Sequence, residues 1–154
     1  MKPAAIFLLL VMAAPALAQE ISVDTVGIGT TQQFFEPLSG DLMVTDSRST
    51  IDVFEGLDDT PLAGMTARCF GSTTILRGVP RGNGNCVFTD PEGDKVLQSW
   101  AVDQVGQGTS SGTWFFVGGT GKHEGIVGRG HFNRYTQNTS GKTETHIAGV
   151  ARWQ

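Results

Sequence analysis

Apolar and polar residues alternate one by one in several short runs of the chain. The stretches 20–28 and 49–55 both show this pattern, and Ile51 and Val53 fall on one face of the second. Such alternation is typical of a β-strand with one buried face, whereas an amphipathic helix repeats its apolar positions at spacings of three and four. No window of a dozen residues here has the helical spacing. The pattern therefore predicts an all-β domain of short strands.

The composition supports this prediction, because the 21 glycines stand among Thr, Ser, Val and aromatic residues, which is typical of short strands joined by tight turns. The Asp and Pro content of 57–61 predicts a turn, and 79–85 predicts a flexible loop. Further strands are predicted at 65–76, 113–117, 125–135 and 142–153, together with one that places Val96, Gln98, Trp100 and Val102 on the same face.

The sequence Asp90-Pro91-Glu92-Gly93 lies between two β-favouring runs. Proline at the second position and glycine at the fourth suit a type I turn followed by a residue with positive φ, so we expect a β-hairpin. The alternation of Asp90, Glu92 and Asp94 leaves a calcium loop as an alternative. An EF-hand, however, needs a longer ligand series that ends in a bidentate Glu, and we expect no metal here.

The first 18 residues have the three parts of a secretory signal peptide: a basic start at Lys2, an apolar run over 4–12 and the small-residue ending Ala16-Leu17-Ala18. The run is shorter than the roughly 20 residues of a membrane-spanning helix. A lipoprotein would have a cysteine at the cleavage point, and this chain has none there. We therefore expect residues 1–18 to be removed. Residues 19–154 then form a single domain, without a membrane span, that works in the periplasm or outside the cell.

The charge of the chain excludes one class of partner. Its formal net charge is −4, and it has no run of Lys and Arg. Proteins that bind nucleic-acid backbones need clustered basic residues, so we expect no nucleic-acid partner.

The chain has two cysteines, Cys69 and Cys86. In an oxidising compartment such a pair is expected to form a disulfide. The alternative is a metal or redox pair, but the sequence has no C-x-x-C spacing and no nearby His to complete a ligand set.

Two blocks of the sequence resemble a known superfamily. The block 117–130, with its Val117-Gly118-Gly119-Thr120-Gly121 turn, resembles the β-barrel superfamily of allene oxide cyclases and dirigent proteins. The block 84–96, with Cys69 upstream, resembles exported bacterial members of the allene-oxide-cyclase-barrel-like group. The resemblance implies a calycin-like, eight-stranded antiparallel closed barrel, often with a central cavity for an apolar small molecule. None of the catalytic positions of the plant cyclases matches this chain, so the resemblance carries no activity.

The last two predicted strands each have a polar face. Alternate residues of a strand lie on opposite faces. In the first of the two strands, the face opposite the polar one carries glycines and Phe132. The polar faces carry Arg129, His131, Asn133 and Tyr135 in the first strand, and Glu144, His146 and Arg152 in the second.

A hairpin centred between residues 138 and 139 places His131 opposite His146, and Asn133 opposite Glu144. Such a group could transfer protons or hold an anionic head group, because His titrates near neutrality and Arg binds carboxylates bidentately. His131, His146 and Glu144 are thus the candidate catalytic residues, and a metal site of the two His and one Glu is a weaker alternative. We favour the interpretation that this face is the solvated outside of the domain.

Aromatic residues supply the candidates for a core or a cavity wall. Aromatics bury large apolar areas, whereas Gln98, between Val96 and Trp100, needs a hydrogen-bond partner if it is buried. The candidate ligand-binding residues are Gln98, Trp100, Trp114, Phe116, Arg129 and Asn133.

Three functional hypotheses follow. The leading one is an extracytoplasmic barrel that binds a small hydrophobic or amphiphilic molecule without a cofactor. The second is a cyclase or isomerase that steers a reactive apolar intermediate, and the third is a structural or interaction module whose barrel is filled by side chains. Hydrolase chemistry has little support, because the sequence lacks a G-x-S-x-G elbow.

Overall fold

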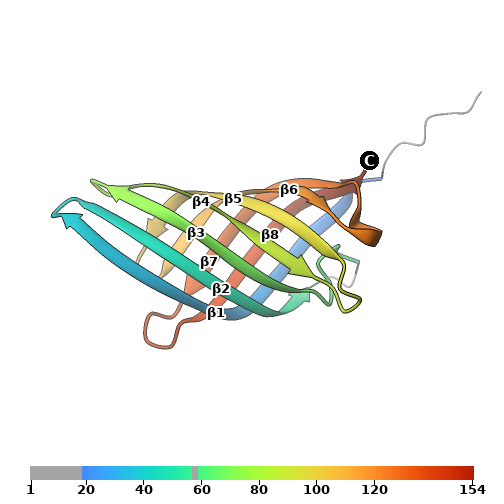
Figure 1. Cartoon of the computed structure of the whole chain (residues 1–154), viewed down its shortest axis with the longest axis horizontal. Helices are drawn as coiled ribbons and strands as arrows, with labels where there is room; N and C mark the ends of the chain where they lie inside the picture. Colours follow the sequence, from blue (N-terminus) through green and yellow to red (C-terminus); the bar gives the residue numbers. More distant parts are fainter. Residues whose placement is uncertain (1–18, 57–58) are drawn as a thin grey trace, which may run out of the picture.

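The protein is an all-β, eight-stranded antiparallel closed barrel, as predicted (Figure 1). The computed structural model describes residues 19–56 and 59–154, so the predicted signal peptide lies outside the described residues. Each strand pairs with the next in the sequence, and β8 returns to pair with β1. The strands are β1 Ile21–Ser39, β2 Leu42–Gly56, β3 Thr66–Leu76, β4 Val79–Thr89, β5 Lys95–Gly106, β6 Thr109–Gly119, β7 Ile126–Thr136 and β8 Lys142–Trp153.

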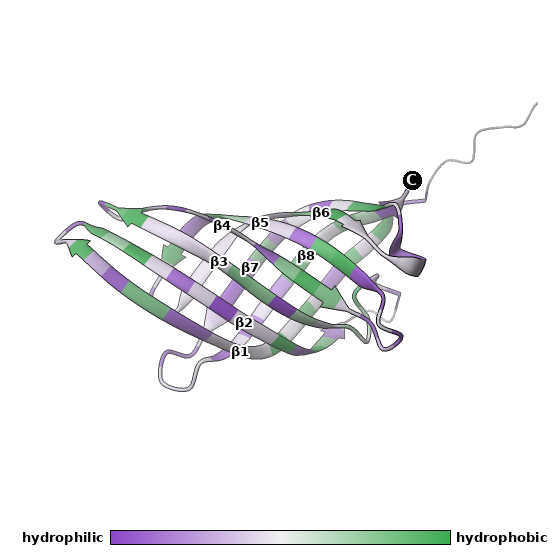
Figure 2. Cartoon of the chain, in the orientation of Figure 1, coloured by the Kyte–Doolittle hydropathy of each residue, from purple (hydrophilic) through white to green (hydrophobic). Residues whose placement is uncertain are grey.

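Helical structure is confined, within the described ranges, to one short 3₁₀ turn, η1 Gly121–His123, between β6 and β7. None of the helices in this part of the chain has the length and hydrophobicity that a transmembrane helix requires. Figure 2 shows hydrophobic and hydrophilic residues interleaved along the strands, which is the alternation seen in the sequence.

The prediction of a flexible loop at 79–85 is wrong, because this segment is the first half of β4. It pairs with β3 through a two-residue turn at Arg77-Gly78, where both residues have positive φ, 53° and 78°. Turns of this kind match the twist of the adjoining strands. The glycines and asparagines of the segment therefore belong to a strand.

The prediction that Ile51 and Val53 share a face is also wrong. The register between β1 and β2 shifts at Ile28/Gly29, which leaves Asp52 as an extra residue in β2. An extra residue reverses the alternation beyond it. Ile51 is accordingly 3% exposed and Val53 45% exposed, and Phe54 takes the inward position instead.

One half of the barrel is filled by large apolar side chains. Phe88 packs against both Phe54 and Phe116, with ring centroids 5.5 and 6.4 Å apart. The connection between β2 and β3 adds the fully buried Leu62 and Met65. This half lies where β2 ends and β3 begins, and we call it the closed end.

The predicted disulfide and hairpin are confirmed. Cys69 and Cys86 are bonded to each other, are directly opposite in the β3–β4 register and lie buried in the core. In the hairpin between β4 and β5, the amide of Gly93 donates to the carbonyl of Asp90 at 3.1 Å, and Gly93 has φ 94°.

Candidate functional site

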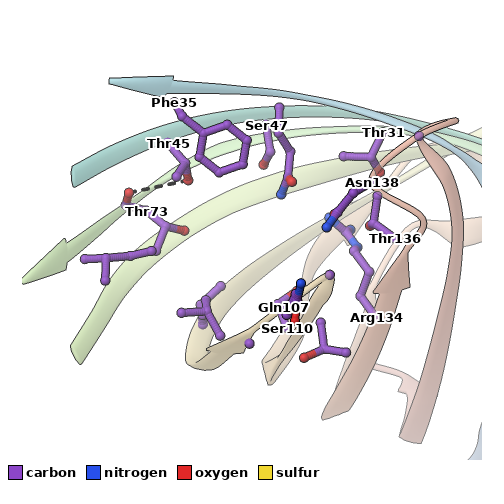
Figure 3. Close-up of a pocket in the computed structure, with 18 of the residues that line it drawn as sticks. Thr31, Phe35, Thr45, Ser47, Thr73, Gln107, Ser110, Arg134, Thr136 and Asn138 are labelled. Carbon is purple, nitrogen blue, oxygen red and sulfur yellow. Dashed lines mark hydrogen bonds between the residues drawn. The ribbon is translucent and has the colours of Figure 1, made fainter. Parts of the chain in front are cut away.

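The other half of the barrel contains a cavity of about 450 Å³, which we call the end cavity (Figure 3). It lies between the inner faces of the strands where the β1–β2, β3–β4, β5–β6 and β7–β8 turns gather. The inward positions here are mostly Ser, Thr and Gln rather than Phe and Trp. Because these side chains are small or reach only part of the way across, they leave the space open.

The floor of the end cavity is aromatic. Trp100 of β5 and Phe132 of β7 meet edge to face, with ring centroids 6.3 Å apart and planes at 74°. Trp100 finds room because Gly71 and Gly84, which pair with each other, carry no Cβ where its indole ring lies. These two rings separate the packed half of the barrel from the hollow half.

Apolar side chains also line the outermost part of the cavity. Phe35, Met43 and Ile75 stand near the tips of the β1–β2 and β3–β4 hairpins and face inward. Figure 1 shows that these two hairpins project beyond the rest of the barrel. The aromatic floor and the apolar hairpin tips are therefore two surfaces of the cavity that a hydrophobic group could contact.

A band of hydroxyl groups lies in and behind the wall of the end cavity, and Thr31 and Thr136 of this band line the space. Thr143 Oγ1 is 2.8 Å from Thr31 Oγ1 and 3.1 Å from Thr136 Oγ1, and Thr31 Oγ1 is 2.9 Å from Ser49 Oγ. All four side chains are buried. The hydroxyls satisfy one another, so this part of the wall is polar without an unpaired group.

Arg134 of β7 brings the one charge into this space. It is the single charged side chain among the described residues that line the end cavity. Its Nε donates to Thr145 Oγ1 at 3.2 Å, and it has no carboxylate partner among the ion pairs of the described chain. Burial lowers the pKa of Arg134 to about 10, which still leaves the guanidinium charged at neutral pH.

The sequence contained the signal for Arg134, although it was not among the candidates. The period-two count that placed Arg129, His131 and Asn133 on the polar face of β7 also places Arg134 on the face of Phe132. The two-residue spacing alone therefore predicts that Arg134 shares the face of Phe132.

The candidate catalytic residues lie on the outside of the barrel. His131 and Glu144 are exposed. His146 is also exposed, and its Nε2 is 2.8 Å from Oδ1 of Asp24 on β1. The interior of the barrel therefore receives none of these three side chains.

The predicted pairing between these residues is wrong by two positions. His131 is opposite Ala148, and His146 is opposite Asn133. The turn closes later than expected, because the amide of Gly141, with φ 69°, donates to the carbonyl of Gln137. A shift by an even number of residues preserves the faces.

The candidate ligand-binding residues are divided among three places. Trp100 lines the end cavity, whereas Gln98, Trp114 and Phe116 are buried in the packed half. Gln98 is 3% exposed, and its Nε2 has no hydrogen-bond partner among the residues that the structure describes. Arg129 and Asn133 are exposed on the outside, where Asn133, Glu144 and His146 line a surface depression of about 630 Å³.

A second polar cluster lies at the closed end, around the β4–β5 hairpin. Asp90 is buried and accepts hydrogen bonds from the amides of Glu92 and Asp94, each at 2.9 Å. Its Oδ2 is 2.9 Å from Lys122 Nζ and 3.1 Å from His123 Nε2. Lys122 above all, and then His123, hold the pKa of Asp90 well below its usual value, against the opposing effect of burial.

The same cluster contains the three acidic residues of the calcium alternative. Asp90, Glu92 and Asp94 bring carboxylate oxygens within 4.8 Å of one another. The ammonium group of Lys122 also lies 2.6 Å from Glu92 Oε2. The carboxylates of Glu92 and Asp90 raise the pKa of Lys122. Lys122 thus offsets the negative charge of Asp90 and Glu92, and these ion pairs link the β4–β5 hairpin to η1 at the closed end.

Comparison of the chain with protein-family models, with curated proteins and with solved structures found no match.

Proposed function

We propose that this protein is an exported barrel that binds a small amphiphilic molecule in the end cavity. The observation that carries the proposal is the hollow half of the barrel, because a space of about 450 Å³ falls in the range of small-molecule sites. Its lining combines the Trp100–Phe132 floor with a hydroxyl band and Arg134, which matches a ligand with one apolar and one polar part.

Two features of the sequence support the placement outside the cytoplasm. Residues 1–18 have the pattern of a signal peptide, and the Cys69–Cys86 bond is of a kind that persists in oxidising compartments. The resemblance to allene oxide cyclases and dirigent proteins supports the cavity as a ligand site, since their barrels often hold an apolar small molecule. Membership of that superfamily is part of the proposal.

The other two hypotheses receive less support. The cyclase hypothesis rested on His131, His146 and Glu144, which are outside the cavity. The hypothesis of a filled barrel describes only the closed end, where Phe88 and its neighbours pack.

The test is native mass spectrometry of the protein purified from the compartment to which it is exported. We expect a small molecule retained on the wild-type protein. We expect its loss in Ser47→Phe, because Ser47 faces the cavity and a phenyl group there takes up part of the space. The matched control is Thr50→Phe, three residues further along β2 on the exposed outer face.

A thermal-unfolding assay with added amphiphiles completes the test. A ligand present at 100 times its Kd stabilises the folded state by about 2.7 kcal/mol, so wild type and Thr50→Phe should gain stability and Ser47→Phe should not. Absence of a retained molecule together with absence of ligand-dependent stabilisation contradicts the proposal.

A further inference from the structure

We propose that the ligand of the end cavity is an anion, a tailed carboxylate or another tailed oxyanion, whose charged group is bound by Arg134. The inference rests on the function proposed above and adds the charge and the orientation of the ligand. Three properties of Arg134 carry it: its place inside the barrel, its lack of an ionic partner and its unused hydrogen-bond donors.

The place of Arg134 is unusual for a charged residue. Arg134 is half-buried on the inward face of β7, between Phe132 and Thr136, which are both buried. Figure 3 shows its side chain among residues of the cavity wall, near Thr136 and Asn138. Arginine, by contrast, is normally found at the surface unless it is paired.

Because Arg134 is half-buried and lacks an ionic partner, part of the cost of withdrawing its charge from water is not offset. Moving a charge out of water is expensive, and attraction to an opposite charge is what offsets it. No carboxylate performs this role for Arg134 within residues 19–56 and 59–154. An anionic ligand would supply the missing charge, and it would also reverse the depression of the pKa that burial causes.

The donors of the guanidinium show how the anion would be held. A guanidinium has five N–H groups, and in the described structure one of them, Nε–H, is directed at Thr145. Neither terminal nitrogen donates a hydrogen bond to a described residue, so both can bind the two oxygens of a carboxylate, which is the geometry that arginine prefers. Asn138 and Gln137 line the same end of the cavity and offer amide donors.

The floor sets the orientation of the ligand. Phe132 is two residues from Arg134 on the same face of β7, which is about 7 Å along a strand. A head group on Arg134 would therefore place an attached apolar chain against Phe132 and Trp100. The net charge of the chain is −4, so attraction to an anion comes from this local charge and not from the surface as a whole.

The experiment compares decanoate with 1-decanol by calorimetric titration of the protein without its signal peptide. The two probes have the same chain length, and only decanoate is charged at neutral pH. We expect the Kd of wild type for decanoate to be at least tenfold lower than for decanol. In Arg134→Gln, decanoate affinity should fall at least tenfold while decanol affinity stays within twofold.

Two further variants refine the test. Arg134→Lys should keep part of the preference for decanoate, since it retains the charge but loses the bidentate geometry. Arg129→Gln is the matched control, because it removes an exposed arginine of the same strand, and it should bind both probes as wild type does. Should Arg134→Gln fail to fold, the wild-type comparison and Arg134→Lys still decide.

Contrary outcomes separate this inference from the proposed function. Equal affinity of wild type for decanoate and decanol overturns the role of Arg134 and leaves the binding function standing. Failure of both probes to bind overturns the binding function and this inference with it. Acetate binding as tightly as decanoate would mean that the cavity takes a small anion without a tail, which also overturns the inference.

Discussion

Single side chains decide how the two ends of the barrel are stabilised. At the closed end, the buried carboxylate of Asp90 contacts Lys122, His123 and two backbone amides. In the hollow half, neutral hydroxyls such as those of Thr31 and Thr143 satisfy one another. The closed end therefore depends on a carboxylate that titrates in acid, whereas these hydroxyls of the hollow half carry no charge.

The charge of Asp90 predicts a loss of stability in acid. Its pKa is lower in the folded state than the ordinary 3.8, so its stabilising effect is present above that value and is lost as pH falls below it. We expect wild type to lose more unfolding free energy than Asp90→Asn between pH 7 and pH 2, measured by urea denaturation. Parallel pH profiles of the two proteins would contradict this role of Asp90.

At the scale of strands, glycines on one strand make room for aromatic rings on another. Trp100 lies over the paired Gly71 and Gly84, and a Cβ at either glycine would meet the indole ring. Trp114 uses Gly149 of β8 in the same way. The high glycine content of the strands is thus a packing requirement as well as a signal for turns.

We predict that Gly84→Ala destabilises the protein by about 1–3 kcal/mol, the usual range for added volume in a packed interior. Its new methyl group would push against Trp100, so the variant should also bind ligand less well. The control is Gly40→Ala in the β1–β2 turn, where an added Cβ meets nothing within 4 Å. Chemical denaturation measures both, and a Gly84→Ala protein as stable as the control would refute the packing argument.

Over the whole molecule, the packed core and the cavity that we propose as the ligand site lie at different levels along the barrel axis. The packed half contains the aromatic cluster and the disulfide, and the hollow half contains the end cavity. A change deep in the packed half should therefore affect folding more than ligand affinity.

Leu62→Ala tests this separation, because Leu62 is fully buried at the closed end. We expect a loss of about 2–5 kcal/mol in unfolding free energy, as for other buried leucines, with decanoate affinity close to that of wild type at temperatures where the variant is folded. Denaturation and titration calorimetry on one preparation measure both quantities. A large drop in the affinity of the folded variant would show that the two halves are coupled.

Most of the local structure could be predicted from the amino-acid sequence. Alternation identified the strand positions of β5 and the two faces of β7 and β8, the Asp90–Gly93 sequence predicted the hairpin, and the lone cysteine pair predicted the disulfide. These features depend on residues close together in the chain or on the number of cysteines, so the sequence is enough to predict them. The prediction of a loop at 79–85 failed because Gly84 makes room for Trp100 and Gly82 for Thr73, which are contacts with neighbouring strands that the local sequence does not show.

Which parts of the interior are full and which are hollow depends on how the eight strands close into the barrel. Alternation gives two faces for a strand, but closure of β8 onto β1 fixed the inward face and placed Arg134 inside and His131 and His146 outside. The end cavity exists because small inward side chains from many strands meet at one level of the cylinder. Which inward side chains lie at the same level depends on the register between the strands. The cavity therefore cannot be predicted from any single stretch of sequence.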